Sequence, residues 1–264
     1  MAFDFSEYAE FEQQYTVEDC RRDLGTVVQW FRERDYHQFA MEICLVKERK
    51  LPIEVGDMLD LFWVDEDLPL GALPDWMKSD SLGVVRGKNI VQMGRLVYPV
   101  KDVYGNVAGF VGWDPFVQPK YLDSRNYGYK AKRTMLMGME KMYEYYTSDE
   151  PVYLVEGVVC MAYLRSKGFN ALAALGSFLT PYVLVMLRRF GRRLIVIPDC
   201  DAAGDKFVRQ CKFKLIQATI VQPKYGKDVD GCRKEEDGKY EEQLLKDLVG
   251  LKNPFYRTTV FIRR

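Results

Sequence analysis

The chain has 264 residues and a mass of 30.8 kDa, and its 38 Lys and Arg residues balance 38 Asp and Glu residues. A hydrophobic fraction of 48% and a charged fraction of 29% exclude a disordered tail and predict one large or two small globular domains. No apolar run approaches the roughly 20 residues of a membrane-spanning helix, and the acidic start lacks the order of a signal peptide. We therefore expect a cytoplasmic protein with no membrane partner.

The six cysteines are scattered over the sequence, and no two of them form a Cys-x-x-Cys pair. A zinc ribbon or zinc finger is therefore not expected, and reduced thiols in a reducing cytoplasm are. The charge is unevenly distributed, with a net −11 over residues 1–77, +5 over residues 78–145 and +6 over residues 146–264. The basic part suggests a polyanionic partner, although charge alone is more often only a solvated surface.

An aromatic stripe marks the acidic start of the chain, where Phe5, Tyr8, Phe11 and Tyr15 follow one another at three- and four-residue spacing. This spacing predicts a short amphipathic helix. Such a stripe either packs on its own domain, which is the commoner case, or docks a partner protein.

Apolar runs alternate with helical patterns in the carboxy-terminal half. Strands are predicted at 152–157, 170–176, 192–201 and 218–223, and helices at 158–168, 180–191 and 202–216. Thr180 supplies a capping hydroxyl before Pro181, and Gly191 suits the left-handed end of that helix. The alternation with short connections predicts an α/β fold, with a parallel sheet flanked by helices.

Acidic residues follow three of these predicted strands. Glu156 ends the first, Asp199 and Asp201 end the third, and Asp228 and Asp230 lie just past the fourth. Ligands of such sheets bind beyond the carboxyl ends of the strands. Since residues two apart in an extended segment point the same way, each Asp-x-Asp pair is expected to aim both carboxylates at one place.

Five carboxylates gathered at the carboxyl ends of the strands repel one another unless cations lie among them. Hard oxygen ligands of this kind favour Mg²⁺ or Mn²⁺. The alternative, equally weighted for either pair alone, is that the aspartates merely cap the next helix. Glu156 is harder to explain in this way, because an unpaired carboxylate next to a buried strand is costly.

Glu156-Gly157 at the end of a strand, followed by Asp199-Cys200-Asp201-Ala-Ala-Gly, resembles the Toprim domain. This domain occurs in bacterial-type primases, topoisomerases, some nucleases and recombination mediators. The residues before it narrow the choice, because they resemble the basic subdomain and helical start of DnaG-type primases. The matching stretches are 45–64, 81–87, 95–112, 119–124 and 130–138, and GKDVDG at 226–231 resembles the acidic motif of these primases.

The resemblance implies RNA primer synthesis on a single-stranded DNA template from nucleoside triphosphates, by metal-dependent nucleotidyl transfer. It implies catalytic roles for Glu156, Asp199 and Asp201, and a site for Mg²⁺ or Mn²⁺ that Asp228 and Asp230 complete. No side chain stands out as a general base. The predicted activity is therefore that of a DNA primase.

The resemblance also implies nucleotide- or DNA-binding roles for Arg95, Lys120, Tyr121 and Lys132. Tyr121 is predicted to stack a base, or else to pack beside Leu122. Three positions depart from the family pattern: Cys160 stands where an acidic residue is common, Asp123 where Asn is usual, and Cys200 where Gly is common. Cys160 puts one metal site in doubt.

The resemblance divides the chain into an acidic, helical extension (1–40), a mixed α+β basic subdomain (41–145), a Toprim domain (146–245) and a short tail (246–264). Residues 1–40 lack a zinc-ligand set, and the tail is too short for a helicase-binding domain. We therefore expect a stand-alone phage-type core in the host cytoplasm, with a separate zinc-binding subunit and the replicative helicase as partners. The alternatives are a Toprim-family metal-dependent nuclease and a non-catalytic nucleic-acid-binding replication factor.

Overall fold

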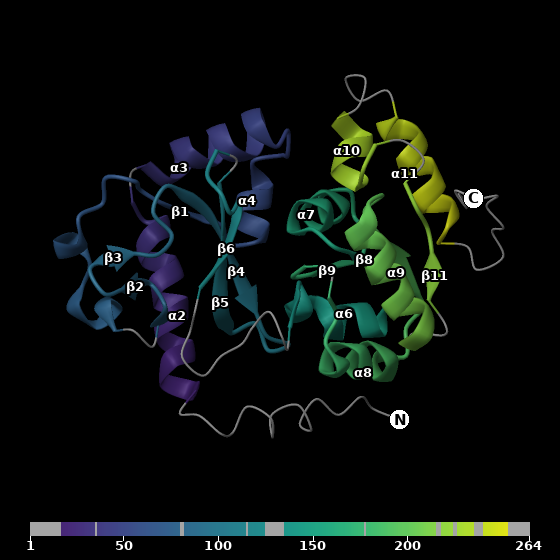
Figure 1. Ribbon diagram of the computed structural model, residues 1–264, viewed down its shortest axis with the longest axis horizontal. Coiled ribbons are helices and arrows are strands. Elements are labelled where there is room, and N and C mark those ends of the chain that lie inside the picture. The colour runs from purple at the N-terminus through teal and green to yellow at the C-terminus, as the bar shows by residue number, and fades with distance from the viewer. Residues whose placement is uncertain are drawn as a thin grey trace. The chain divides into compact units, whose positions relative to one another are not determined.

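The structure is a computed structural model that describes residues 17–34, 36–79, 82–114, 116–124, 135–176, 178–214, 218–223, 226–234 and 240–252. The chain divides into two compact units, residues 1–132 (unit 1) and residues 133–264 (unit 2), whose elements are labelled in Figure 1. Among the described residues, no helix is long and apolar enough to cross a membrane. The predicted stripe of Phe5, Tyr8, Phe11 and Tyr15 lies outside the described residues, and so does Lys132.

Helices come first in the described part of unit 1. They are α2 (Val17–Arg32), α3 (Tyr36–Met41), the π-helix η1 (Glu42–Glu48) and α4 (Glu54–Met58), followed by the 3-10 helices η2 (Leu70–Ala72) and η3 (Asp75–Lys78). Along α2, Leu24, Val28 and Phe31 are buried at helical spacing. One face of this helix therefore packs on the core of unit 1.

An antiparallel sheet of order β1-β4-β5-β6 completes the core of unit 1. Its strands are β1 (Phe62–Val64), β4 (Arg95–Lys101), β5 (Val107–Trp113) and β6 (Tyr121–Asp123), and β2 (Val85–Arg86) and β3 (Asn89–Ile90) form a separate two-stranded sheet. The ring of Phe62 stacks on Phe31 with centroids 5.1 Å apart and meets Phe110 edge to face at 5.5 Å. These contacts hold α2 against β1 and β5.

Unit 2 contains the predicted α/β sheet, in the order β11-β10-β8-β9-β7. Its parallel strands are β8 (Val152–Val155), β9 (Ala171–Ala174), β10 (Leu194–Ile197) and β11 (Thr219–Ile220), and β7 (Leu136–Met137) pairs antiparallel with β9. Every residue of β8, β9 and β10 is buried. This explains why these strands are continuous apolar runs rather than alternating patterns.

The helices of unit 2 follow the predicted order. They are η5 (Met139–Lys141), α6 (Met142–Thr147), α7 (Val158–Ser166), α8 (Pro181–Phe190), α9 (Ala202–Lys214), α10 (Val229–Lys234) and α11 (Glu241–Gly250). The hydroxyl of Thr180 accepts a hydrogen bond from the Val183 N–H (3.4 Å), and Gly191 ends α8 with φ of 68°. The two predicted ends of α8 are thereby confirmed.

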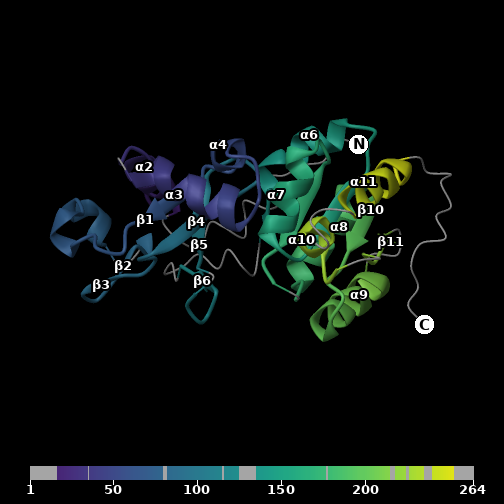
Figure 2. The same cartoon turned by 90° about the horizontal axis from the view of Figure 1, so that it is seen from above.

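The connections leave the sheet in two directions. Helix α7 leads from β8 to β9, whereas α8 returns across β8 to β10 and α9 continues outward to β11. Because such connections are right-handed, α7 belongs on one face and α8 and α9 on the other. The contacts agree, since α8 contacts α9 while α7 contacts α10 and α10 contacts α11, and Figure 2 shows α9 and α11 on different sides of β10. The direction changes between β8 and β10, whose carboxyl ends therefore form the expected ligand site.

Candidate active site

Glu156 and Asp199 meet at the carboxyl ends of β8 and β10. The register pairs Val155 with Ile197, so the residues that follow each strand emerge side by side. The carboxylate of Glu156 accepts a hydrogen bond from the Asp199 N–H (3.0 Å), and Glu156 is only 8% exposed. The fold therefore brings together two residues that are 43 positions apart in the sequence.

Asp201 caps a helix through one carboxylate oxygen and forms an ion pair through the other. Its Oδ1 accepts hydrogen bonds from the Ala203 N–H (2.9 Å) and the Gly204 N–H (3.0 Å), so it caps α9. Its Oδ2 lies 2.8 Å from Nζ of Lys227, and the same ammonium group lies 3.5 Å from Oδ2 of Asp199. The first Asp-x-Asp pair therefore aims at one place, which Lys227 occupies.

The second Asp-x-Asp pair differs from the prediction, because α10 begins at Val229 and the segment is not extended. Asp228 accepts a hydrogen bond from the Gly231 N–H (2.6 Å) at the start of this helix. Asp230 is buried within the first turn, and its Oδ2 lies 3.0 Å from Nζ of Lys234. The predicted shared direction of Asp228 and Asp230 is wrong, since the helix turns them to different partners.

The carboxylates of unit 2 are crowded. Burial, together with the charges of Asp199 and Asp201, raises the pKa of Glu156 to about 7. Burial and the charges of Asp228 and Asp201 raise the pKa of Asp199 to about 6. The hydrogen bond with Lys227 lowers the pKa of Asp201 and raises that of the lysine. Lys227 thus compensates the charge of Asp201 better than it compensates the charges of the buried Glu156 and the partly buried Asp199.

The donor set fits a hard divalent cation in kind. Carboxylate oxygens are the ligands that Mg²⁺ and Mn²⁺ prefer. Burial, and to a lesser extent the neighbouring carboxylate charges, raises the pKa values of Glu156 and Asp199. As they stand, however, the described residues include no group of three or more His, Cys, Asp or Glu side chains arranged to hold a metal ion. Between Asp199 and Asp201 the positive charge is that of Lys227.

Cys160 lies beside this acidic cluster, in α7. Burial, and next the charge of Asp228, raise the pKa of its thiol well above the usual value. A neutral thiol is a poor metal ligand. At the position where the family resemblance implies an acidic residue, this chain therefore has a buried neutral group.

Close backbone packing at Gly204 shapes the cluster. A Cβ atom at this position would lie 1.8 Å from the carbonyl oxygen of Asp199. Only glycine lets the first turn of α9 approach the Asp199 backbone, which brings Asp199 and Asp201 to the same ammonium group.

In unit 1, the predicted nucleotide-binding residues fall into two groups. Lys120 is exposed, and Tyr121, the first residue of β6, is 43% exposed. Arg95 is only 5% exposed, and its Nη1 donates to the carbonyl oxygens of Pro119 and Lys120 (3.2 Å each). Lys120 and Tyr121 are therefore accessible to a ligand, whereas Arg95 lies inside unit 1.

Sequence reasoning missed three residues of these sites. Lys227 directly precedes Asp228, and a cation next to an acidic motif is a signal that the sequence offers. Arg49 donates from Nη2 to the Tyr121 hydroxyl (3.1 Å), and Gln92 donates from Nε2 to the Leu122 carbonyl (3.0 Å). Neither of these two contacts has a sequence signal, because both depend on how the strands pair.

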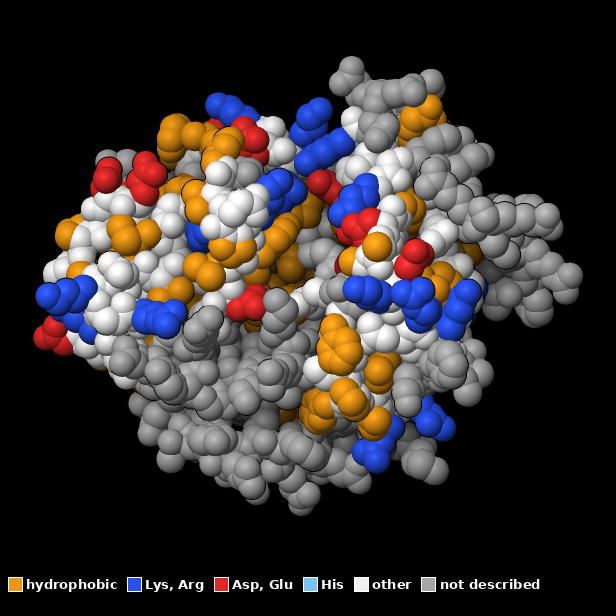
Figure 3. All heavy atoms as spheres, viewed as in Figure 1, with side chains coloured by type: hydrophobic (Ala, Val, Ile, Leu, Met, Phe, Trp, Pro, Cys, Tyr) orange, Lys and Arg blue, Asp and Glu red, His pale blue; other side chains and the backbone are white. Residues whose placement is uncertain are grey.

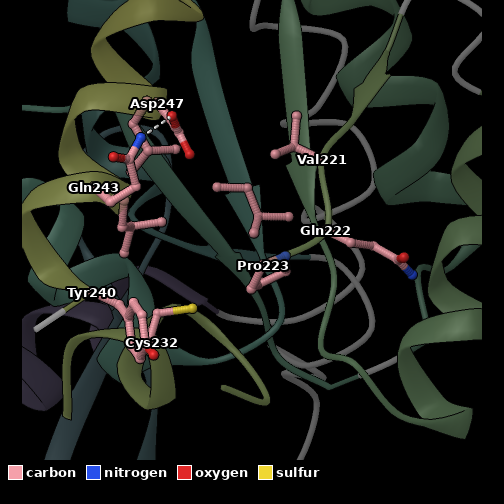
Figure 4. A pocket seen from close by; sticks show the side chains of 10 residues that line it. Val221, Gln222, Pro223, Cys232, Tyr240, Gln243 and Asp247 are labelled. Atoms are coloured by element: carbon pink, nitrogen blue, oxygen red, sulfur yellow. Dashed lines mark hydrogen bonds between the residues drawn. The ribbon is translucent and has the colours of Figure 1, made fainter. Parts of the chain in front are cut away.

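A basic helix face and a pocket are two further features of unit 2. Helix α9 exposes Lys206, Arg209 and Lys212, and Figure 3 shows basic side chains gathered over it. The pocket in Figure 4 lies between the segment after β11 and α11, and is lined mainly by apolar side chains, with Gln243 donating to Asp247 (2.8 Å). It contains none of the predicted site residues.

Comparison with known proteins places the Toprim-like family over residues 153–232. The DNA primase of Aquifex aeolicus is 30% identical over 174 residues, which are 63% of this chain and 34% of that protein. The DNA primase of Borreliella burgdorferi is 27% identical over 221 residues, which are 77% of this chain and 42% of that protein. The chain thus spans less than half the length of these relatives.

Solved structures agree. The Aquifex aeolicus primase (zinc binding and RNA polymerase domains) superposes with a TM-score of 0.73 at 23% identity, covering 92% of this chain and 63% of that one. The DnaG primase catalytic domain bound to ssDNA gives a TM-score of 0.69 at 21% identity, with 90% and 80% covered. At these identities the likeness shows the fold. It confirms the predicted α/β class and the predicted resemblance to a DnaG-type core with a Toprim domain.

Proposed function

We propose that this chain, which has the fold of the DnaG-type primase catalytic core, synthesises RNA primers on single-stranded DNA. The observation that carries the proposal is the convergence of Glu156, Asp199 and Asp201 at the carboxyl ends of β8 and β10. Relatives named DNA primase, and a structural neighbour named as bound to ssDNA, support it.

In this reaction the 3′-hydroxyl of one nucleotide attacks the α-phosphate of the next, and pyrophosphate leaves. The barrier is the approach of an oxygen nucleophile to a polyanion, so the protein must mainly position groups and neutralise charge. When bound, a divalent cation, Mg²⁺ or Mn²⁺, supplies that positive charge to the triphosphate and to the attacking oxygen. No general base from the protein is required.

Glu156, Asp199 and Asp201 would hold the cation, with Asp228 and Asp230 completing the acidic set. The backbone N–H of Asp199 orients Glu156, and the N–H groups at the start of α9 orient Asp201. With Asp199 and Asp201 holding a divalent cation, Lys227 would add a positive charge for binding the triphosphate. Cys160 contributes no charge, so the part of the site nearest to it is weaker than in primases with an acid there.

Lys120 and Tyr121 of unit 1 would bind the nucleic acid. The ammonium of Lys120 attracts phosphate, and the exposed ring of Tyr121 stacks a base. Lys132 is proposed for the same task from the sequence alone. The basic face of α9 adds positive charge to unit 2.

We also propose two protein partners. A zinc-binding subunit and the replicative helicase would supply start-site selection and delivery to the replication fork, and the Aquifex aeolicus structure is named for a zinc-binding domain beside its polymerase domain. A pull-down from infected or replicating cells that recovers neither partner would contradict this part.

A primer-synthesis assay tests the function. The chain is incubated with ribonucleoside triphosphates, Mn²⁺ and a single-stranded DNA template, and the products are separated on a denaturing gel. A primase gives RNA products that are absent with Glu156→Gln and present with the exposed control Glu144→Gln. A Toprim nuclease shortens the template instead. A non-catalytic binding protein neither produces RNA nor shortens the template.

A further inference from the structure

We infer that Arg95 is a positioning residue rather than a nucleic-acid contact, and that it acts together with Gln92. The two side chains hold the segment that carries Lys120 and Tyr121, so that this pair is ready to bind single-stranded template. The inference rests on the proposed function, because that function gives Lys120 and Tyr121 their ligand.

The surroundings of Arg95 argue against a phosphate contact. With 5% exposure, its side chain offers almost no surface to a ligand. Its Nη1 already donates to two carbonyl oxygens, those of Pro119 and Lys120, at 3.2 Å each. Drawing this guanidinium out to a phosphate would leave these two carbonyls without that donor.

Gln92 holds the same segment at its other end. This residue precedes β4 and is 4% exposed, and its Nε2 donates to the carbonyl oxygen of Leu122 at 3.0 Å. The carbonyls of Pro119, Lys120 and Leu122 are thus bonded to two buried side chains. The backbone on both sides of Tyr121 is fixed from inside unit 1.

Gly112 makes the space for this arrangement. It lies in β5, opposite Val97 of β4 and Leu122 of β6. A Cβ atom there would lie 1.8 Å from Oε1 of Gln92 and 2.9 Å from Cδ of Arg95. The absent side chain lets both residues reach across β5 to the β6 side.

The ring of Tyr121 is held as well. Its hydroxyl accepts a hydrogen bond from Arg49 (3.1 Å), whose guanidinium carbon lies 3.8 Å from the ring centroid of Trp113. Trp113 pairs with Tyr121 in the β5–β6 register. Backbone and ring are therefore both set before a ligand arrives, which reduces the ordering cost of binding.

The experiment measures binding of a fluorescent single-stranded DNA oligonucleotide to the full chain at several salt concentrations. Each phosphate contact adds about 0.7 to the slope of log affinity against log salt. Lys120→Ala is expected to make this slope shallower by about 0.7. If the variant and the wild type bind equally at 1 M salt, the variant then binds about eightfold more weakly at 50 mM salt. The matched control Lys88→Ala, an exposed lysine between β2 and β3, should keep the wild-type slope.

The double-mutant cycle separates the two roles of Arg95. If Arg95 positions Lys120, then Arg95→Met and the double variant Arg95→Met/Lys120→Ala both lose the same 0.7 as Lys120→Ala. Gln92→Met removes no charge, yet should lower the slope in the same direction. It also serves as the second variant if Arg95→Met does not fold, which thermal unfolding reports.

A double variant that loses about 1.4 would mean that Arg95 contacts a phosphate itself, and would overturn the inference. Wild-type slopes in both Arg95→Met and Gln92→Met would overturn it too. An unchanged slope in Lys120→Ala would have a different meaning. That result would show that Lys120 does not contact the nucleic acid, so both this part of the proposed function and the inference would fail.

Discussion

In unit 2, carboxylates are crowded at the carboxyl ends of the central strands β8 and β10, whereas in unit 1 the buried guanidinium of Arg95 lies against carbonyl oxygens. Burial of Glu156 and partial burial of Asp199 raise the pKa values of these two groups, and Lys227 compensates their charges only in part. Arg95 instead has acceptors for its Nη1 within its own unit. The difference teaches that a charged residue in a family motif is a candidate ligand contact where its charge lacks compensation, and a structural one where acceptors surround it.

The largest expected effect breaks the acidic cluster. Asp199→Asn keeps the shape of the side chain and removes a charge that we propose holds the divalent cation, so primer synthesis should fall on the order of a thousandfold. The matched control Asp205→Asn, an exposed position in the first turn of α9, should retain activity. Activity within tenfold of wild type for Asp199→Asn, measured as RNA product per minute, would contradict the assigned role.

Substitution of one glycine in each unit by alanine is expected to lower the free energy of unfolding to different extents. A methyl group added at Gly204 meets the backbone carbonyl of Asp199, which cannot move aside. A methyl group added at Gly112 meets the side chains of Gln92 and Arg95. Gly204→Ala should therefore destabilise by about 3 kcal/mol and Gly112→Ala by about 1 kcal/mol.

Urea unfolding followed by circular dichroism measures both, with Gly71→Ala as control, since a methyl group there meets nothing within 4 Å. Gly112→Ala should also weaken binding of single-stranded DNA, because it displaces the two residues that hold Lys120. Equal destabilisation by the two variants would show that the side chains in unit 1 are as immovable as the backbone in unit 2.

Periodicity and strand-end position made much of unit 2 predictable. The four parallel strands, the ends of α8 and the meeting of Glu156 with Asp199 follow from patterns that the sequence displays. The turn of Asp230 into α10 does not, because GKDVDG reads equally well as a loop. The burial of Arg95 could not be predicted either, since it depends on an absent side chain at Gly112, in another strand.

The pH dependence of stability distinguishes the units further. The folded-state pKa values of Glu156 (about 7) and Asp199 (about 6) are raised, so the folded protein binds more protons than the unfolded chain between about pH 4 and pH 7. Without divalent cations, the stability contributed by these two groups is present at low pH and is lost as the pH rises through 6 and 7.

Thermal unfolding between pH 5 and pH 8 checks this, with Glu156→Gln expected to flatten the profile. Added Mn²⁺ should raise the unfolding temperature more at pH 8 than at pH 5, because it binds the ionised carboxylates. A stabilisation by Mn²⁺ that is larger at pH 5, or independent of Glu156, would place the bound ion elsewhere.

A smaller effect is expected at Lys227, which pairs with Asp199 and Asp201 and which we propose competes with a divalent cation for them. Lys227→Met should tighten Mn²⁺ binding about two- to fivefold, since an exposed ion pair contributes up to about 1 kcal/mol. Calorimetric titration with Mn²⁺ measures it, and Lys246→Met, which removes an exposed lysine paired with Glu242 in α11, should leave it unchanged. Weaker Mn²⁺ binding in Lys227→Met would mean that the lysine organises the aspartates instead of competing for them.

The smallest effect separates the ring of Tyr121 from its hydroxyl. Tyr121→Phe loses only the exposed hydrogen bond from Arg49, so the affinity for single-stranded DNA should fall less than about threefold. Tyr121→Ala removes the ring, and a stacked base is worth about 1–3 kcal/mol, or roughly five- to more than a hundredfold in affinity. Because stacking is insensitive to salt whereas the Lys120 contact is not, the loss in Tyr121→Ala should persist at 0.5 M salt with an unchanged slope. Equal affinities of Tyr121→Ala and wild type would mean that the ring only packs beside Leu122, and unit 1 would then bind the template through charge alone.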